Sequence, residues 1–147
     1  MKALLQRVSS ASVEADGQVS GNIDTGLVVF FCAMKGDADK DLDYIVNKVA
    51  QLRIFDDGQG KMNRSILDIH GSALVIPQFT LAAATRRGNR PSFEEAEAPE
   101  KAKDLYEEFV RRLKGRGAHV QTGVFAATMA VSLVNYGPVT IWLDSRA

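Results

Sequence analysis

Gln78 and Thr80 stand out by chemical type, because they follow directly on an apolar run at residues 74–77. The run is typical of a buried strand, and we expect that strand to extend over residues 74–81. Alternation along a strand would place Gln78 and Thr80 on one face and Phe79 on the other. Pro77 has no N–H to donate, so the ladder is expected to break just before the polar pair. These residues fit either an active site at a broken strand end or an edge strand with two solvated polar side chains.

Gly137-Pro138 is the second informative position, between two predicted strands at residues 129–134 and 139–143. A glycine before a proline can point backbone carbonyls into a cleft without a side chain in the way. The alternative interpretation is an ordinary turn.

The usual hydrolytic and metal-binding constellations are missing. Neither histidine lies in a nucleophile–base motif, and there is no G-x-S-x-G, H-E-x-x-H, Walker loop or Cys/His zinc spacing. We therefore expect no metal and no cofactor. Thr80 as a covalent nucleophile would need an activating base, and none lies near it in sequence. An enzyme built on these residues must take much of its chemistry from the substrate or from backbone amides.

Length and composition limit the class of protein. A chain of 147 residues is expected to form one domain, residues 1–147. The formal net charge is zero, so any contact with nucleic acid must come from local clusters. The single cysteine, Cys32, excludes an internal disulfide and lies in the apolar run 27–34, where a buried thiol is expected. With no signal-peptide layout and no spanning run, we expect a cytoplasmic protein without membrane contact.

The elements that position these residues alternate between strands and helices. Strands are expected at 2–15, 19–23 and 27–34, with a hairpin turn at Asp16-Gly17. Apolar spacings of three and four predict helices beginning at Asp39 and Pro99. Residues 62–72 are interpreted as short strand and turn, and further strands are expected at 119–122, 129–134 and 139–143. This order predicts a mixed, largely antiparallel α/β domain with two principal helices.

A basic loop follows the central stretch. Arg86, Arg87 and Arg90 lie within five residues around Gly88. Such a cluster fits phosphate binding, and it equally fits a solvated loop.

Two motifs give the sequence a family resemblance. IPQFTL at 76–81 resembles the SQFTL motif of D-aminoacyl-tRNA deacylases, and NYGPVT at 135–140 resembles their NxGPVT motif. The flanking segments match as well, from ALLQRV near the N-terminus through RIFDDGQGKMN at 53–63 and RGNRPSF at 87–93 to QTGVFAATMAVSLVN at 121–135. The resemblance covers the whole chain.

The resemblance implies a fold and a reaction. The family fold is a small homodimer around a strand-rich, barrel-like core, with each active site at the dimer interface. Its members hydrolyse the ester between a D-amino acid and the 3′-terminal ribose of tRNA, and they also clear glycine mischarged on alanine tRNA. The partners implied for this chain are thus the 3′ ends of D-aminoacyl-tRNA and glycyl-tRNA, and a second copy of itself.

The resemblance also implies catalytic roles. Gln78, Phe79 and Thr80 would line the ester, with the Phe79 N–H stabilising the oxyanion. The 2′-hydroxyl of the terminal ribose would assist hydrolysis, so that no catalytic triad is needed. The substrate pocket would include Pro77, Met129 and Phe125, whose ring would lie against the terminal adenine.

Chiral selection would come from Gly137-Pro138, which is cis in the family and is inserted from the partner subunit. Its carbonyls would hold the substrate amino group and leave no room for an L side chain, so that selection works by exclusion. Glycine has no side chain to exclude and should be accepted. Arg7 would hold the Gly-Pro element in orientation.

Two departures from the family pattern keep alternatives open. Pro77 replaces the serine at the first position of SQFTL, and Tyr136 occupies a variable position where aspartate is common. Because Phe79 and Gly137-Pro138 are intact, we expect D-selectivity. The alternatives are a relaxed deacylase that also removes L-alanine, motivated by Pro77, and a non-catalytic module that binds tRNA ends or DNA.

Overall fold

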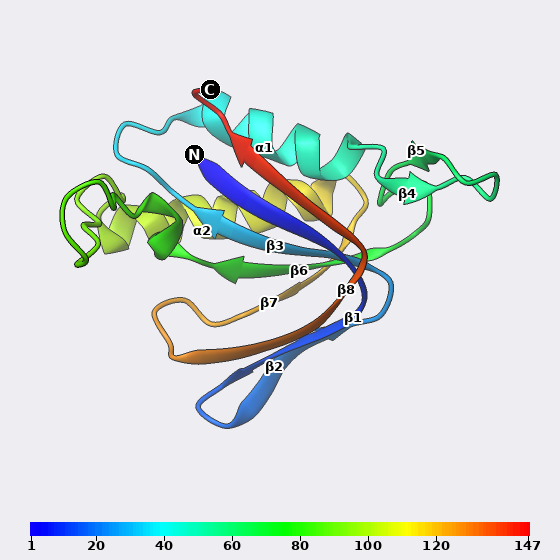
Figure 1. The fold of residues 1–147 in the computed structure, drawn as a ribbon, viewed down its shortest axis with the longest axis horizontal. Coiled ribbons are helices and arrows are strands. Elements are labelled where there is room, and N and C mark those ends of the chain that lie inside the picture. The colour runs from blue at the N-terminus through cyan, green and yellow to red at the C-terminus, as the bar shows by residue number, and fades with distance from the viewer.

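The computed structural model describes residues 1–147, in which one strongly curved sheet carries two helices (Figure 1). The main strands are β1 (Lys2–Ala15), β2 (Gln18–Ile23), β3 (Gly26–Cys32), β6 (Ser72–Pro77), β7 (His119–Thr122) and β8 (Met129–Asp144). A small hairpin is formed by β4 (Phe55–Asp56) and β5 (Met62–Arg64), and the helices are α1 (Asp39–Gln51), the 3-10 helix η1 (Phe79–Ala82) and α2 (Pro99–Gly115). Neither α-helix is long and apolar enough to cross a membrane.

The sheet is organised around β1, which pairs antiparallel with β2, β3 and β8. Strands β3, β6 and β7 run parallel, because α1 and α2 lie in the connections that return the chain to the same end of the sheet. The Ser20 hydroxyl on β2 donates to the Thr122 carbonyl on β7 at 3.1 Å, which brings the two ends of the sheet together. The predicted α/β, barrel-like, largely antiparallel domain with two helices is confirmed, with parallel pairing at β3-β6-β7.

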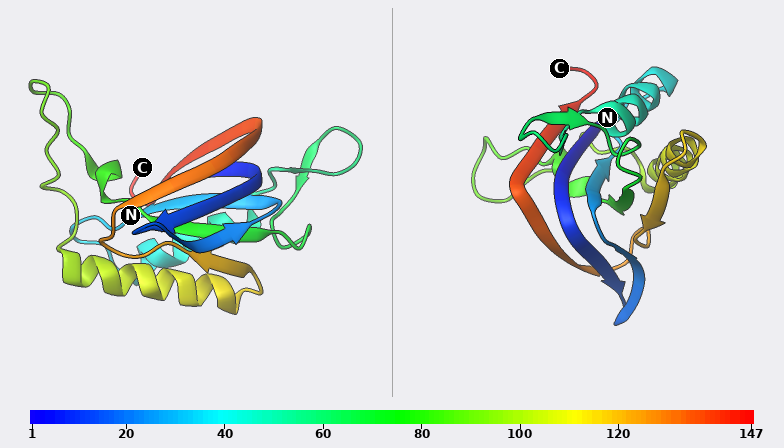
Figure 2. Two further views of the ribbon diagram at one scale, coloured as in Figure 1. Left: turned by 90° about the horizontal axis from the view of Figure 1, so that it is seen from below. Right: turned by 90° about the vertical axis from the view of Figure 1, so that its right-hand side faces the viewer.

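Strand alternation divides the apolar residues between two cores. On β3, Leu27, Val29 and Phe31 face the larger core, which both helices cover from the same side of the sheet (Figure 2, right). Val28 faces the opposite way, into a smaller core inside the curve of the sheet with Leu74. The helix predicted from Asp39 is confirmed, and its residues at spacings of three and four are buried: Leu42, Ile45, Val46 and Val49.

Two predicted strand boundaries are wrong. The strand expected to continue to residue 81 ends at Pro77, and the 3-10 helix η1 follows it. The expected break of the ladder before Gln78 is confirmed. The two strands expected at 129–134 and 139–143 form one strand, β8, of 16 residues. Its pairing with β1 steps from Asn135↔Val8 to Thr140↔Gln6, so residues 136–139 bulge out of the ladder instead of ending it.

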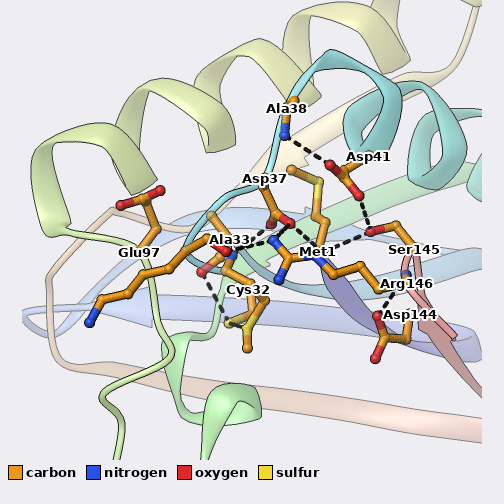
Figure 3. Close-up of polar contacts among 12 residues, drawn as sticks. Met1, Cys32, Ala33, Asp37, Ala38, Asp41, Glu97, Asp144, Ser145 and Arg146 are labelled. Atoms are coloured by element: carbon orange, nitrogen blue, oxygen red, sulfur yellow. Dashed lines mark hydrogen bonds and ion pairs between the residues drawn. The ribbon is translucent and has the colours of Figure 1, made fainter.

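The chain termini are tied to the start of α1 by a buried polar network (Figure 3). The Met1 ammonium is fully buried and lies 2.7 Å from the Asp37 carboxylate, and it also donates to the Ser145 hydroxyl at 2.8 Å. The same hydroxyl donates to Asp41 at 2.6 Å, while the other Asp41 oxygen accepts from the N–H of Ala38, the residue that caps α1. First strand, last strand and helix are thereby joined through charged hydrogen bonds.

Candidate active site

The centre of the site is the turn at which β6 ends. Pro77 is the last residue of the strand, and the Gln78 N–H donates to the Phe31 carbonyl of β3 at 2.7 Å. The chain then turns into η1, where the Gln78 amide nitrogen donates to the Thr80 hydroxyl at 2.5 Å. The two polar side chains are thus together as predicted, although a 3-10 turn brings them together and not strand alternation. Phe79 points outward, and 60% of its surface is exposed.

The N–H groups of Phe79 and Thr80 are the first two of η1. The opening N–H groups of a helical turn have no acceptor within that turn. Neither N–H donates to a backbone carbonyl elsewhere in the chain, so two adjacent donors are free at the start of η1, next to the Gln78 side chain.

A mostly apolar cavity of about 720 Å³ opens beside this turn. Five of the predicted site residues line it, namely Pro77, Gln78, Phe79, Phe125 and Met129. Thr80 is not part of the lining, and it is linked to the cavity only through its hydrogen bond with Gln78. A second cavity, at the other end of the sheet and lined by serines that include Ser10 and Ser132, contains none of the predicted residues.

The wall opposite Gln78 is set by the connection between β7 and β8. The Gly123 N–H donates to the Val75 carbonyl at 3.1 Å, and a Cβ at Gly123 would lie 2.7 Å from the Met129 sulfur. A glycine at this position therefore lets Met129 approach the backbone. The Phe125 ring packs at 6.0 Å from the buried ring of Tyr106, which fixes its position on the cavity wall.

Phe93 and Cys32 line the cavity without having been predicted as site residues. The Phe93 ring packs edge-on against Phe79 at 5.2 Å and closes the outer side. The only signal for Phe93 was its place in the RGNRPSF segment. Burial raises the pKa of the Cys32 thiol to about 11, and the thiol donates to the Phe79 carbonyl at 3.6 Å. The expectation of a buried thiol is confirmed, and a protonated thiol is a poor nucleophile.

No histidine lines the cavity, so a Ser–His or Cys–His mechanism has no base there. Glu97 lines it, but its carboxylate is engaged by the Ala98 N–H and by Lys101, contacts that lower the pKa of Glu97. No group of three or more His, Cys, Asp or Glu side chains has the placement of a metal site. The turn beside the cavity offers backbone N–H groups, the Gln78 amide and the Thr80 hydroxyl, and the cavity offers mostly apolar walls. Such groups can bind and polarise an ester.

Gly137-Pro138 lies in the bulge of β8, and its peptide bond is cis. Arg7, only 7% exposed, donates from Nε to the Tyr136 carbonyl at 2.9 Å and from Nη1 to the Ile54 carbonyl at 2.8 Å. A Cβ at Gly137 would lie 2.8 Å from Nη2 of Arg7. Arg7 thus packs directly against the Gly-Pro segment.

Within one chain, Gly137-Pro138 lies away from the cavity beside Gln78. Pro77 pairs with Phe31 near the end of β3, whereas Arg7 pairs with Leu27 near its beginning. Four residues along a strand and three strand spacings across the sheet separate the two places, a path of about 20 Å measured within the sheet. The Gln78 cavity and the Gly-Pro segment therefore lie at different ends of one sheet.

Comparisons with known proteins place this chain in a family. A family model described as D-Tyr-tRNA(Tyr) deacylase matches residues 4–144. A D-aminoacyl-tRNA deacylase from Aquifex aeolicus is 53% identical over 146 residues, which is 99% of each chain. This chain belongs to the D-Tyr-tRNA(Tyr) deacylase family.

Solved structures agree with the deacylase fold. One, named c-Myc DNA Unwinding Element Binding Protein, is 37% identical with a TM-score of 0.94 and covers 100% of both chains. Another, described as a probable eukaryotic D-amino acid tRNA deacylase, has a TM-score of 0.81 over 97% of each chain. At 18% identity the second likeness concerns the fold. The predicted family is confirmed, and in this deacylase the IPQFTL segment forms the turn beside the cavity.

Proposed function

We propose that this deacylase hydrolyses the ester of D-aminoacyl-tRNA, and of glycyl-tRNA mischarged on alanine tRNA, to release the free amino acid and tRNA. The full-length identity of 53% to a D-aminoacyl-tRNA deacylase carries the proposal. The cavity beside Gln78 supports it, because amide, hydroxyl and backbone N–H donors converge there without a histidine.

In the proposed mechanism the ester carbonyl lies at the start of η1. The Phe79 N–H stabilises the oxyanion that forms when the carbonyl is attacked. The neighbouring 2′-hydroxyl of the terminal ribose assists the attack of water, and Thr80 holds the ester through its hydroxyl. Phe125 provides an aromatic face for the terminal adenine. The apolar cavity excludes bulk water around these contacts and strengthens them.

Chirality would be read across a homodimer. The Gly137-Pro138 segment of the partner subunit would enter the cavity, where its carbonyls hold the substrate ammonium and occupy the space of an L side chain. The separation of segment and cavity by four residues along the strands and three strand spacings within one chain supports an arrangement of this kind. Strand β8 supports dimerisation, because it pairs on one side only and exposes Val134, Tyr136 and Trp142.

The test is a parallel assay with D-Tyr-tRNA, L-Tyr-tRNA, Gly-tRNA and L-Ala-tRNA. We expect D-tyrosine and glycine to be released while L-Tyr-tRNA survives. Equal hydrolysis of the D and L esters of tyrosine would contradict the proposed chiral filter. Release of L-alanine at a comparable rate would favour the relaxed deacylase motivated by Pro77.

A second candidate function is binding to DNA without catalysis. It is favoured by the TM-score of 0.94 to a protein named for binding a DNA unwinding element. The formal net charge of zero argues against general duplex binding, which depends on many phosphate contacts. Saturating protein that leaves all four esters intact, but retards duplex DNA, would favour this function.

A further inference from the structure

A basic arm projects from the rim of the cavity. Residues 85–91 form a loop closed by two hydrogen bonds between Ala84 and Ser92, at 2.8 and 3.0 Å. Figure 2 (left) shows this part of the chain, in yellow-green, extending away from the sheet and helices. Gly88, with a φ of +62°, allows the turn at the tip, and a Cβ there would meet nothing within 4 Å.

The arm carries three cations that have no partner in the chain. Arg86, Arg87 and Arg90 are exposed, and none of their guanidinium groups makes an ion pair or a side-chain hydrogen bond. Most arginines outside the arm are engaged; Arg112, for example, binds Asp39 and Asp43. In a chain of zero net charge, the arm is thus a local concentration of unused positive charge.

The position of the arm relates these cations to the cavity. Phe93, just after the closing bridge, packs against Phe79 and lines the cavity. Glu94 and Glu97 also line the cavity, at the base of the arm. Lys35 lines it too, so the lining carries one cation and two carboxylates, whereas residues 85–91 of the arm carry three arginines and no carboxylate. A ligand that is neutral or cationic at its inner end and polyanionic at its outer end fits this polarity.

We propose that Arg86, Arg87 and Arg90 hold the phosphates of the single-stranded 3′ end of tRNA while the terminal aminoacyl-adenosine occupies the cavity. This inference rests on the proposed function. The terminal ester carries no phosphate beyond the ribose, so every phosphate of the substrate lies on the outward side. Guanidinium groups bind phosphate oxygens through paired hydrogen bonds, and such contacts position the RNA without reading its sequence.

The test compares the triple variant R86Q/R87Q/R90Q with wild type on two substrates. The first is D-Tyr-tRNA, and the second is adenosine carrying the same D-tyrosyl ester and no phosphate. We expect KM for D-Tyr-tRNA to rise at least tenfold with kcat little changed, and hydrolysis of D-tyrosyl-adenosine to be unchanged. The slope of log(kcat/KM) against log salt should fall by about 2, at about 0.7 for each lost single-strand phosphate contact.

The matched control is K40Q/R53Q/K61Q, which removes the same charge from three exposed cations outside the arm. If the control variant and the arm variant lose kcat/KM on D-Tyr-tRNA to the same extent, total charge is responsible and the proposal is overturned. The proposal would also be overturned if the arm variant lost as much activity on D-tyrosyl-adenosine as on D-Tyr-tRNA, since the arm would then act through the packing of Phe93.

Binding of uncharged tRNA separates this inference from the proposed function. A wild type that hydrolyses no D-aminoacyl-tRNA would refute the function, yet the affinity for uncharged tRNA would still report on the arm. We expect the arm variant to bind uncharged tRNA at least tenfold more weakly than the control variant. Equal affinities would overturn the inference even if the enzyme is active. Matching thermal midpoints of the three proteins establish that all are folded.

Discussion

Thr80 is the residue whose replacement best distinguishes the possible mechanisms. Its hydroxyl accepts from the Gln78 amide at 2.5 Å, and no base approaches it. We expect Thr80→Ala to slow hydrolysis of D-Tyr-tRNA about tenfold without abolishing it, because one hydrogen bond is lost while the 2′-hydroxyl of the tRNA remains. Single-turnover kinetics measure this effect, with Thr128→Ala, an exposed threonine, as control. Complete loss of activity together with a trapped acyl-enzyme in the wild type would instead establish Thr80 as a nucleophile.

Gly137 is constrained by its own backbone and by its neighbours. Its φ of +132° disfavours any side chain, and a Cβ would lie 2.8 Å from Arg7 and 2.9 Å from Val139. We expect Gly137→Ala to lower the free energy of unfolding by about 1–3 kcal/mol and to reduce hydrolysis of D-Tyr-tRNA at least tenfold. Gly115→Ala is the matched control, because a Cβ there meets nothing within 4 Å. Thermal unfolding and initial rates measure both effects, and a variant that keeps wild-type values in both would show that the segment tolerates a side chain.

At the scale of elements, the start of α1 depends on Asp41. Burial alone would raise the pKa of Asp41, but hydrogen bonds from Ser145 and the Ala38 N–H, with the nearby Met1 ammonium, lower it below its ordinary value of 3.8. Folding therefore favours the ionised form of the Asp41 carboxylate. Its contribution to stability is therefore present above pH 3.8 and is lost as the pH falls through the lower pKa of the folded state.

We expect Asp41→Asn to destabilise the protein at pH 7 by about 1–3 kcal/mol, because buried donors lose their charged acceptor. The difference in the free energy of unfolding between this variant and wild type should narrow as the pH falls below 3.8. Urea unfolding at several pH values measures it, and Asp104→Asn, an exposed carboxylate on α2, serves as control. A difference that stays constant down to pH 2 would mean that the charge of Asp41 is unimportant.

The elements were predictable where one local signal dominates. Apolar spacing identified α1 and α2, and Asp16-Gly17, both with positive φ, identified the hairpin between β1 and β2. The errors at 74–81 and 135–138 arose where tertiary contacts decide. Pro77 was a local signal for the end of the ladder, but the turn into η1 that follows it is not revealed by periodicity. Strand β1 pairs along the length of β8, so a Gly-Pro turn signal becomes a bulge within one strand.

The site shows the same division. Pro77, Gln78, Phe79, Phe125 and Met129 were predictable as site residues from the motifs, and the structure places them around one cavity, whereas Thr80 is not part of its lining. Phe93 was not predictable as part of it, because its contact with Phe79 depends on how the arm folds back through the Ala84–Ser92 bridge.

At the scale of the whole molecule, β8 is the expected dimerisation surface. It exposes Val134 at 54% and Trp142 at 49% along a strand with one unpaired edge. We expect the double variant V134K/W142K to shift the protein toward monomers and to lose activity on D-Tyr-tRNA, because buried lysines oppose association. Sedimentation velocity and initial rates measure both effects. The control is Met62→Lys, at an equally exposed apolar residue of β5; a monomeric variant that retains full activity would refute the shared site.

The separation of the Gln78 cavity from Gly137-Pro138 within one chain has a genetic consequence. In the proposed dimer each site draws on both polypeptides. An allele damaged at Gln78 and another damaged at Gly137 would each encode an inactive enzyme. When their products pair, both lesions fall in one site, and the other site is assembled from two undamaged halves. Cells carrying both alleles should therefore recover deacylase activity that neither allele supports alone.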